Sequence, residues 1–131
     1  MLSTLIPEAW REVLQDHLKD IDEIGSELQR RADKGERILP DKKWVFRALE
    51  LNPNEVKLII VGQDPYPNIS DACGLAFSVP PRKSGLPGSL MNIQKEILTD
   101  IGSTTTSDGD LTRWQAQGVM LLNRKIGRAH V

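Results

Sequence analysis

The 131-residue chain has one cysteine, few aromatic residues and almost no excess of either charge. A single cysteine, Cys73, excludes an internal disulfide framework and is typical of a reducing compartment. The formal net charge of -1 excludes a broad basic surface as the main means of holding nucleic acid. Any contact with nucleic acid must therefore be local.

Long apolar runs and targeting signals are also missing. No stretch is apolar over enough residues to cross a bilayer, and the first residues lack the basic region and apolar run of a secretory signal. Because 131 residues allow one modest domain and not two, we expect a single cytoplasmic domain. Cys73 lies between Ala72 and Gly74 without a histidine nearby in the sequence, so we expect a small buried residue rather than a nucleophile.

The first third of the chain has the periodicity of helices. Apolar residues recur at three- and four-residue steps between positions 10 and 28, which predicts one amphipathic helix. His17 falls in its apolar stripe, where we expect a packed structural role rather than a catalytic one. The mixed charges at 30–37 predict a solvated connection, and Asp41 is expected to cap a short helix that reaches Leu49.

Two nearly continuous apolar runs, 56–61 and 119–123, predict strands that are covered on both faces, as in a parallel sheet. Between them we expect a helix capped by Ser89 and a short helix that starts at Asp110 and stops before Gly118. Strand, helices and strand in this order are typical of a parallel crossover. The predicted fold class is therefore α/β.

Polar side chains follow both predicted strands at their carboxyl ends, where open parallel sheets bind ligands. The first strand leads into Gln63, Asp64 and Tyr66, and the second ends at Asn123. A carboxylate can orient water or stabilise developing positive charge, and an amide can read the edge of a planar base. An ordinary turn explains the same residues, because Asp and Pro favour turns on their own account. On the residues alone, both interpretations stay open.

Four motifs in sequence order resemble the first family of uracil-DNA glycosylases: VGQDPYP at 61–67, GLAFSV at 74–79, LPGSLMNIQKE at 86–96 and WQAQGVMLLN at 114–123. The resemblance implies a three-layer αβα fold with a central, mostly parallel sheet that this chain holds incompletely. It also implies hydrolysis of the N-glycosidic bond of uracil in DNA, the start of base-excision repair, without a cofactor or metal. The implied partner is uracil-containing DNA, single- or double-stranded, with no membrane and a monomeric complete protein.

The resemblance assigns three residues to catalysis and base contact. Asp64 would assist the attacking water and stabilise the oxocarbenium-like sugar, a counterpart of the carboxylate in glycoside hydrolysis. Gln63 would contact the base. Phe77 would stack on the uracil after it has flipped out of the helix, although ordinary core packing is an alternative role for this ring.

Three further residues would control specificity and DNA contact. Asn123 would pair its amide with the edge of uracil, which cytosine mismatches. Tyr66 would stand where thymine carries its methyl group and reject that base by collision. Ser89, at the start of a helix, would hold a DNA phosphate.

The chain also departs from the family. Pro67 stands where many members have histidine, which weakens water positioning, and Gly88 stands where they often have proline, which loosens that loop. The family continues well beyond Asn123 with a His-Pro-Ser-Pro loop whose histidine stabilises the departing base, and His130 is no match for it. We therefore expect residues 1–124 to be the N-terminal part of a glycosylase domain and the chain itself to be nearly inactive.

Residues 125–131 resemble a translated sequencing-library adapter, and we expect a non-native tail without function. Two alternatives to a glycosylase fragment stay open. The chain could be a non-catalytic module that binds uracil or DNA, or a structural fragment in which the motif is silent.

Overall fold

The computed structural model describes residues 1–103 and 108–129, so His130 lies outside the described residues. The α-helices are α1 (Glu8–Arg11), α2 (Leu18–Asp33), α3 (Gly88–Ile101) and α4 (Thr112–Ala116). The strands are β1 (Ile38–Leu39), β2 (Leu58–Gly62), β3 (Val119–Asn123) and β4 (Gly127–Arg128). Short 3-10 turns supplement them at Leu2–Leu5, Gln15–His17, Lys42–Trp44, Arg47–Glu50 and Pro53–Glu55. No helix in the described part of the chain is long and apolar enough to span a membrane.

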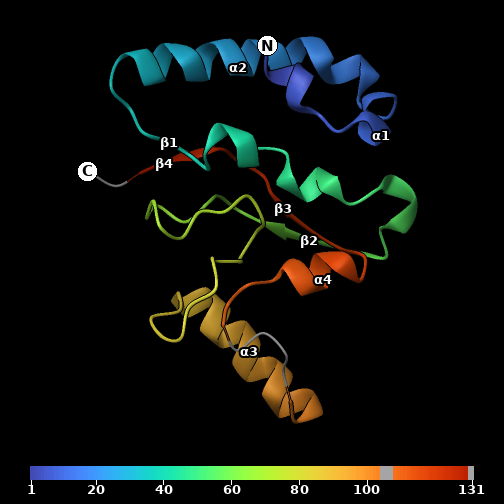
Figure 1. The fold of residues 1–131 in the computed structure, drawn as a ribbon, viewed down its shortest axis with the longest axis vertical. Coiled ribbons are helices and arrows are strands. Elements are labelled where there is room, and N and C mark those ends of the chain that lie inside the picture. The colour runs from blue at the N-terminus through green and yellow to red at the C-terminus, as the bar shows by residue number, and fades with distance from the viewer. Residues whose placement is uncertain (104–107, 130–131) are drawn as a thin grey trace.

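Strands β2 and β3 form the parallel pair that the sequence predicts. Their register sets Leu58 opposite Val119 and Gly62 opposite Asn123, so both strands end at the same edge. The connection between them carries α3 and α4, and helices lie on both sides of the strands in Figure 1. The α/β class is thus confirmed.

A second, antiparallel pair joins β1 to β4 and was not predicted. Ile38 is opposite Arg128 and Leu39 is opposite Gly127, and the amide of Ala129 donates to the carbonyl of Arg37 at 2.9 Å. Each strand has only two residues, too few for a periodic signal in the sequence.

The core lies around β3 and the segments that pack on it. Leu90, Leu111 and Leu121 are fully buried, from α3, the start of α4 and β3 respectively. Cys73 is buried as expected, and its thiol donates to the carbonyl of Ser78 at 3.3 Å. The amide of Ala76 donates to the carbonyl of Leu121 at 3.1 Å and joins the loop before α3 to β3.

The prediction that β2 is covered on both faces is wrong. Leu58, Ile59 and Val61 are 54%, 55% and 55% exposed, and only Gly62 of this strand is buried. The apolar run correctly predicts a strand, but its burial depends on other segments that pack against it. Within the described residues, β2 pairs with β3 alone.

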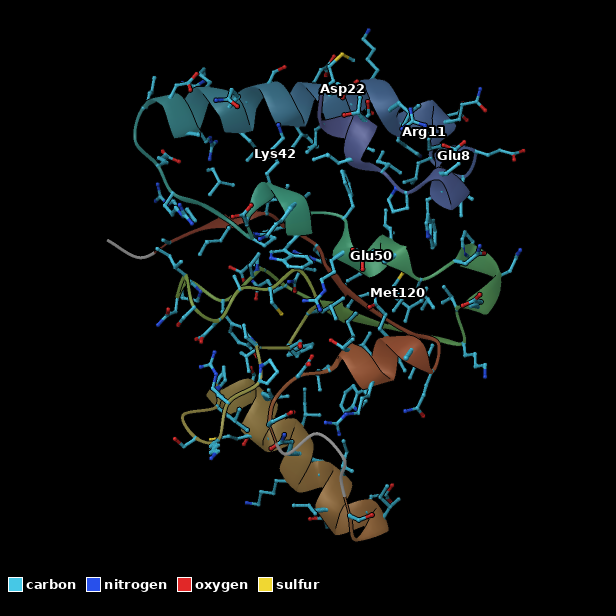
Figure 2. All side chains as sticks on the ribbon, viewed as in Figure 1. Glu8, Arg11, Asp22, Lys42, Glu50 and Met120 are labelled. Atoms are coloured by element: carbon cyan, nitrogen blue, oxygen red, sulfur yellow. The ribbon has the colours of Figure 1, made fainter. Side chains whose placement is uncertain are left out.

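The single helix predicted for residues 10–28 is also wrong. The chain forms α1, a 3-10 turn and then α2, which continues through the charged run to Asp33. Side chains on each helix hold the first residues: Arg11 donates to the carbonyl of Ser3 at 2.7 Å, and Asp22 accepts from the Ser3 amide at 2.8 Å. Arg11 and Asp22 are labelled on these helices in Figure 2. These two anchors impose the bend between α1 and α2. His17, at the N-cap of α2, is exposed rather than packed.

Helix starts differ from prediction by a residue or two. Asp41 does cap a turn, accepting from the Lys43 amide at 3.3 Å, but 3-10 turns replace the expected helix. Helix α3 begins at Gly88 with Pro87 as N-cap, so Ser89 lies in the first turn and is not the cap. Asp110 precedes α4 and accepts from the Thr112 amide at 3.0 Å.

Strand β2 has exposed apolar side chains and an edge that pairs with no other described strand. We expect copies of the chain to associate through this strand, because an exposed apolar edge strand is a template for pairing. We expect Ile59→Lys to lower self-association, measured by light scattering across a concentration series, without loss of folding. The adjacent Ile60 packs against the core, so Ile60→Lys is the matched control and should unfold the chain. Unchanged association in Ile59→Lys would show that another surface is responsible.

Candidate functional site

A cavity of about 680 Å³ opens where β2 and β3 end. This volume is within the usual range of small-ligand sites. Its walls include all six residues singled out in the sequence: Gln63, Asp64, Tyr66, Phe77, Ser89 and Asn123. The structure therefore brings the Asp64 carboxylate and the Asn123 amide to one cavity.

Strand register places Asn123. Because Gly62 is its direct partner on β2, the Asn123 side chain passes over the α-carbon of Gly62. A β-carbon on Gly62 would collide with Oδ1 of Asn123 and lie 3.0 Å from the β-carbon of Ala76. The amide of Arg124 then donates to the Gly62 carbonyl at 3.0 Å and continues the pairing past the strand end. Glycine at 62 is thus a requirement of the amide's position.

The loop after β2 presents its polar groups outward. Gln63 and Asp64 are exposed, whereas Pro65 between them and Tyr66 is buried. A buried proline has a fixed φ and anchors the loop on the core. This arrangement leaves the Asp64 carboxylate accessible from the cavity.

Tyr66 connects the loop to two other walls of the cavity. Its hydroxyl donates to the carbonyl of Phe77 at 2.7 Å and lies 3.2 Å from Oγ of Ser89. Burial raises the pKa of Tyr66, and the hydrogen bond with Ser89 acts in the opposite direction. The phenol is therefore neutral at physiological pH.

The segment 72–79, which we term the Phe77 loop, forms the floor. Phe77 has a φ of 67° and is the one non-glycine residue of positive φ in the described ranges. For a bulky residue this conformation costs roughly 1–2 kcal/mol, so its surroundings must impose it. Leu75 and Val79 are buried while Phe77 is only partly so, which leaves its ring available to the cavity.

Sequence reasoning missed the residues that support this floor. Arg47 donates to the Cys73 carbonyl at 2.8 Å and stacks on Trp44, 4.6 Å from the ring centre. Gly74 has a φ of 91°, and a β-carbon there would strike the Trp44 carbonyl. Only the glycine gave a signal in the sequence, because nothing local to Arg47 indicates a contact 26 residues away.

The cavity also has walls from the end of the chain. Gly127, Arg128 and Ala129 line it, and Arg128 lies 3.7 Å from Glu36 in an ion pair.

A second cavity, of about 750 Å³, lies beneath α2 and contains none of the strand-end residues. Within the described residues, no three His, Cys, Asp or Glu side chains gather in a way that could hold a metal ion.

Fold and site together define an α/β protein with a ligand cavity at the carboxyl ends of parallel strands, lined by a carboxylate, amides and aromatic rings. No family model matches the chain. Curated relatives do. A uracil-DNA glycosylase of Corynebacterium efficiens is 45% identical over 122 residues, which are 92% of this chain and 51% of that protein. One from Mycobacterium avium is 45% identical over 95% of this chain and 55% of its own length.

Solved structures agree with these relatives. The crystal structure of mimivirus uracil-DNA glycosylase matches with a TM-score of 0.87 at 25% identity, over 100% of this chain and 51% of that one. A mimivirus UNG in complex with UGI matches with a TM-score of 0.88 at 25% identity, over 100% of this chain and 52% of that one. The UNG of Nitratifractor salsuginis matches with a TM-score of 0.65 at 25% identity, over 98% of this chain and 64% of that one.

Along almost its whole length the chain belongs to the uracil-DNA glycosylases, in sequence and in fold. The chain spans about half the length of the curated relatives it matches.

Gly62→Ala tests the placement of Asn123. We expect the new methyl group to displace the Asn123 side chain and lower the free energy of unfolding by about 1–3 kcal/mol, as overpacking does. Denaturant unfolding measures the loss. The control is Gly88→Ala, where a β-carbon has no neighbour within 4 Å and should leave stability unchanged or slightly raised. Equal stability of both variants would contradict the close contact.

Proposed function

We propose that the cavity receives a uracil base turned out of DNA, and that the complete protein hydrolyses the bond between this base and its sugar. The observation that carries the proposal is the common position of Asp64 and Asn123 on one cavity at the strand ends. The carboxylate can orient the attacking water, the amide can read the edge of the base, and both must reach the same nucleotide.

Recognition would depend on the Asn123 amide. It accepts from N3–H of uracil and donates to O4, whereas cytosine lacks that proton and carries an amine in place of O4. The Asn123 carbonyl would then face another acceptor, and its NH2 group would face another donor. This arrangement is more costly than a missing contact. Tyr66 would exclude the methyl group of thymine, and Phe77 would stack on the face of the base.

The reaction would depend on Asp64. As the bond to the base breaks, positive charge grows on the sugar, and a nearby carboxylate stabilises it and orients the attacking water. Gln63 would contact the base from the same loop. Ser89 would bind a DNA phosphate in the first turn of α3, where free backbone amides also attract anions.

We extend the proposal to the setting of the protein. It would act as a monomer when complete, in the reducing cytoplasm, where the single free Cys73 is stable. Residues 1–124 would be the glycosylase part, and residues 125–131 a non-native tail.

A second candidate function is a non-catalytic module that binds uracil or DNA. It is favoured by one observation: all six recognition and catalytic residues line a cavity within a chain that spans about half of its relatives. Binding without turnover is its distinguishing result.

Asn123→Leu should remove base recognition at nearly constant side-chain volume. We expect the affinity for free uracil to fall roughly 5- to 150-fold, since an unpaired polar edge costs about 1–3 kcal/mol and 1.4 kcal/mol is tenfold. Titration of uracil followed by the amide NMR signals of the Phe77 loop measures it. Asn92→Leu, at an exposed position of α3, is the control and should bind as the parent does. If the parent binds no uracil, the proposed function fails.

The chain by itself should release uracil from single-stranded DNA roughly 100-fold or more slowly than an intact relative, because loss of one electrostatic catalytic group has an effect of that order. The resemblance places the histidine for the departing base in the part of the family that this chain does not span. Release of free uracil, compared with the Corynebacterium efficiens relative, is the measurement. Turnover close to that of the relative would refute this expectation.

A further inference from the structure

Three separate walls of the cavity meet at the hydroxyl group of Tyr66. Tyr66 belongs to the loop after β2, Phe77 to the Phe77 loop, and Ser89 to the first turn of α3. The phenol oxygen is 2.7 Å from the carbonyl oxygen of Phe77 and 3.2 Å from Oγ of Ser89.

A count of hydrogens gives these contacts a direction. A carbonyl oxygen can only accept, so the one hydrogen of the phenol is donated to Phe77. The contact between Tyr66 and Ser89 then needs the hydrogen of the serine. Ser89 therefore donates to Tyr66, which donates to Phe77, and two aligned bonds of this kind strengthen each other.

The receiving carbonyl belongs to the residue with the left-handed backbone. On either side of it, the amide of Ala76 donates to the Leu121 carbonyl at 3.1 Å and that of Val79 to the Gly109 carbonyl at 3.0 Å. The buried core thus holds the flanking peptides, while a side chain of the cavity holds the carbonyl of Phe77 itself. Loss of that bond frees the Phe77 carbonyl, while the other end of the same peptide group stays held because the Ser78 amide donates to the Leu75 carbonyl at 3.2 Å.

We propose that the Tyr66 hydroxyl is a positioning group for base recognition: it fixes Phe77 in the conformation that presents the ring to the cavity, and Ser89 strengthens that hold. The inference rests on the proposed function, in which Phe77 stacks on the base. It also couples the two ends of the site. When the Ser89 hydroxyl donates to a DNA phosphate, it no longer donates to Tyr66. Contact with the DNA backbone therefore changes the base pocket.

The direction of the relay can be tested by absorbance titration, because Tyr66 is the only tyrosine in the chain. Burial holds the parent pKa above the ordinary value of 10.0, so the stability that Tyr66 contributes is present below that pH and lost as pH rises through the folded pKa. Ser89→Ala removes a donor that stabilises the phenolate, so the pKa should rise further. A fall would mean that Tyr66 donates to Ser89, and it would overturn the relay.

The positioning role is tested by Tyr66→Phe, which removes the hydroxyl and keeps the ring. We expect the backbone carbon chemical shifts of Phe77 to move away from left-handed values and the affinity for uracil to fall roughly 5- to 10-fold, the effect of one lost hydrogen bond. Ser70→Ala is the matched control. It removes a hydroxyl that donates to Asn68 at 2.8 Å in the neighbouring loop, and it should change neither readout.

Each result decides one claim. Unchanged shifts of Phe77 in Tyr66→Phe overturn the positioning role. Shifts that move while no variant, the parent included, binds uracil support the positioning role and overturn the proposed function. Ser89→Ala is a second test of the positioning role. It should move the backbone carbon chemical shifts of Phe77 in the same direction as Tyr66→Phe does, by a smaller amount.

Discussion

The parallel pairing of β2 with β3, with Gly62 directly opposite Asn123, is the constraint on which the site depends. It brings two polar strand ends to one edge and lets the Asn123 side chain cross the bare α-carbon of Gly62. Because side chains alternate along a strand, a slip of one residue would turn Asn123 to the other face of the pair. The amide would then leave the cavity.

Around that pair, the exposed polar groups of the cavity stand on buried supports. The Phe77 loop is tied to β3 through Leu121, and to the 3-10 turns before β2 through Arg47. Pro65 and Ser78 are buried beside exposed Asp64 and half-buried Phe77. Loops that carry chemistry on a rigid scaffold are a general arrangement. Here each loop residue of the site has a buried neighbour in the chain, and Asn123 lies in β3 itself.

The sequence predicts the parts of this fold that depend on local pattern. The run 119–123 with Gly118 before it predicts β3 correctly, since an apolar run after a helix-ending glycine has few other interpretations. It does not predict the exposure of Ile59, which depends on what covers β2. It also misses the bend between α1 and α2, because Ser3 imposes it from a distance while the periodicity continues through it.

The same division applies to the site. The rule that ligands bind at the ends of parallel strands makes Asp64 and Asn123 candidates from the residues alone, beside an ordinary turn, and the structure places both on one cavity. Phe77 and Ser89 enter only through the family resemblance, because neither follows a strand end. The hydrogen-bond relay through Tyr66 joins residues 11 and 23 positions away, a pairing that no periodicity encodes.

The central claim is that this edge of the sheet forms a pocket for one uracil base. Intermolecular nuclear Overhauser contacts between bound uracil and the chain test it most directly. The account predicts simultaneous contacts from one uracil to the ring of Tyr66, the ring of Phe77 and the amide of Asn123. Contacts to the cavity beneath α2 instead, or to Phe77 without Asn123, would contradict it.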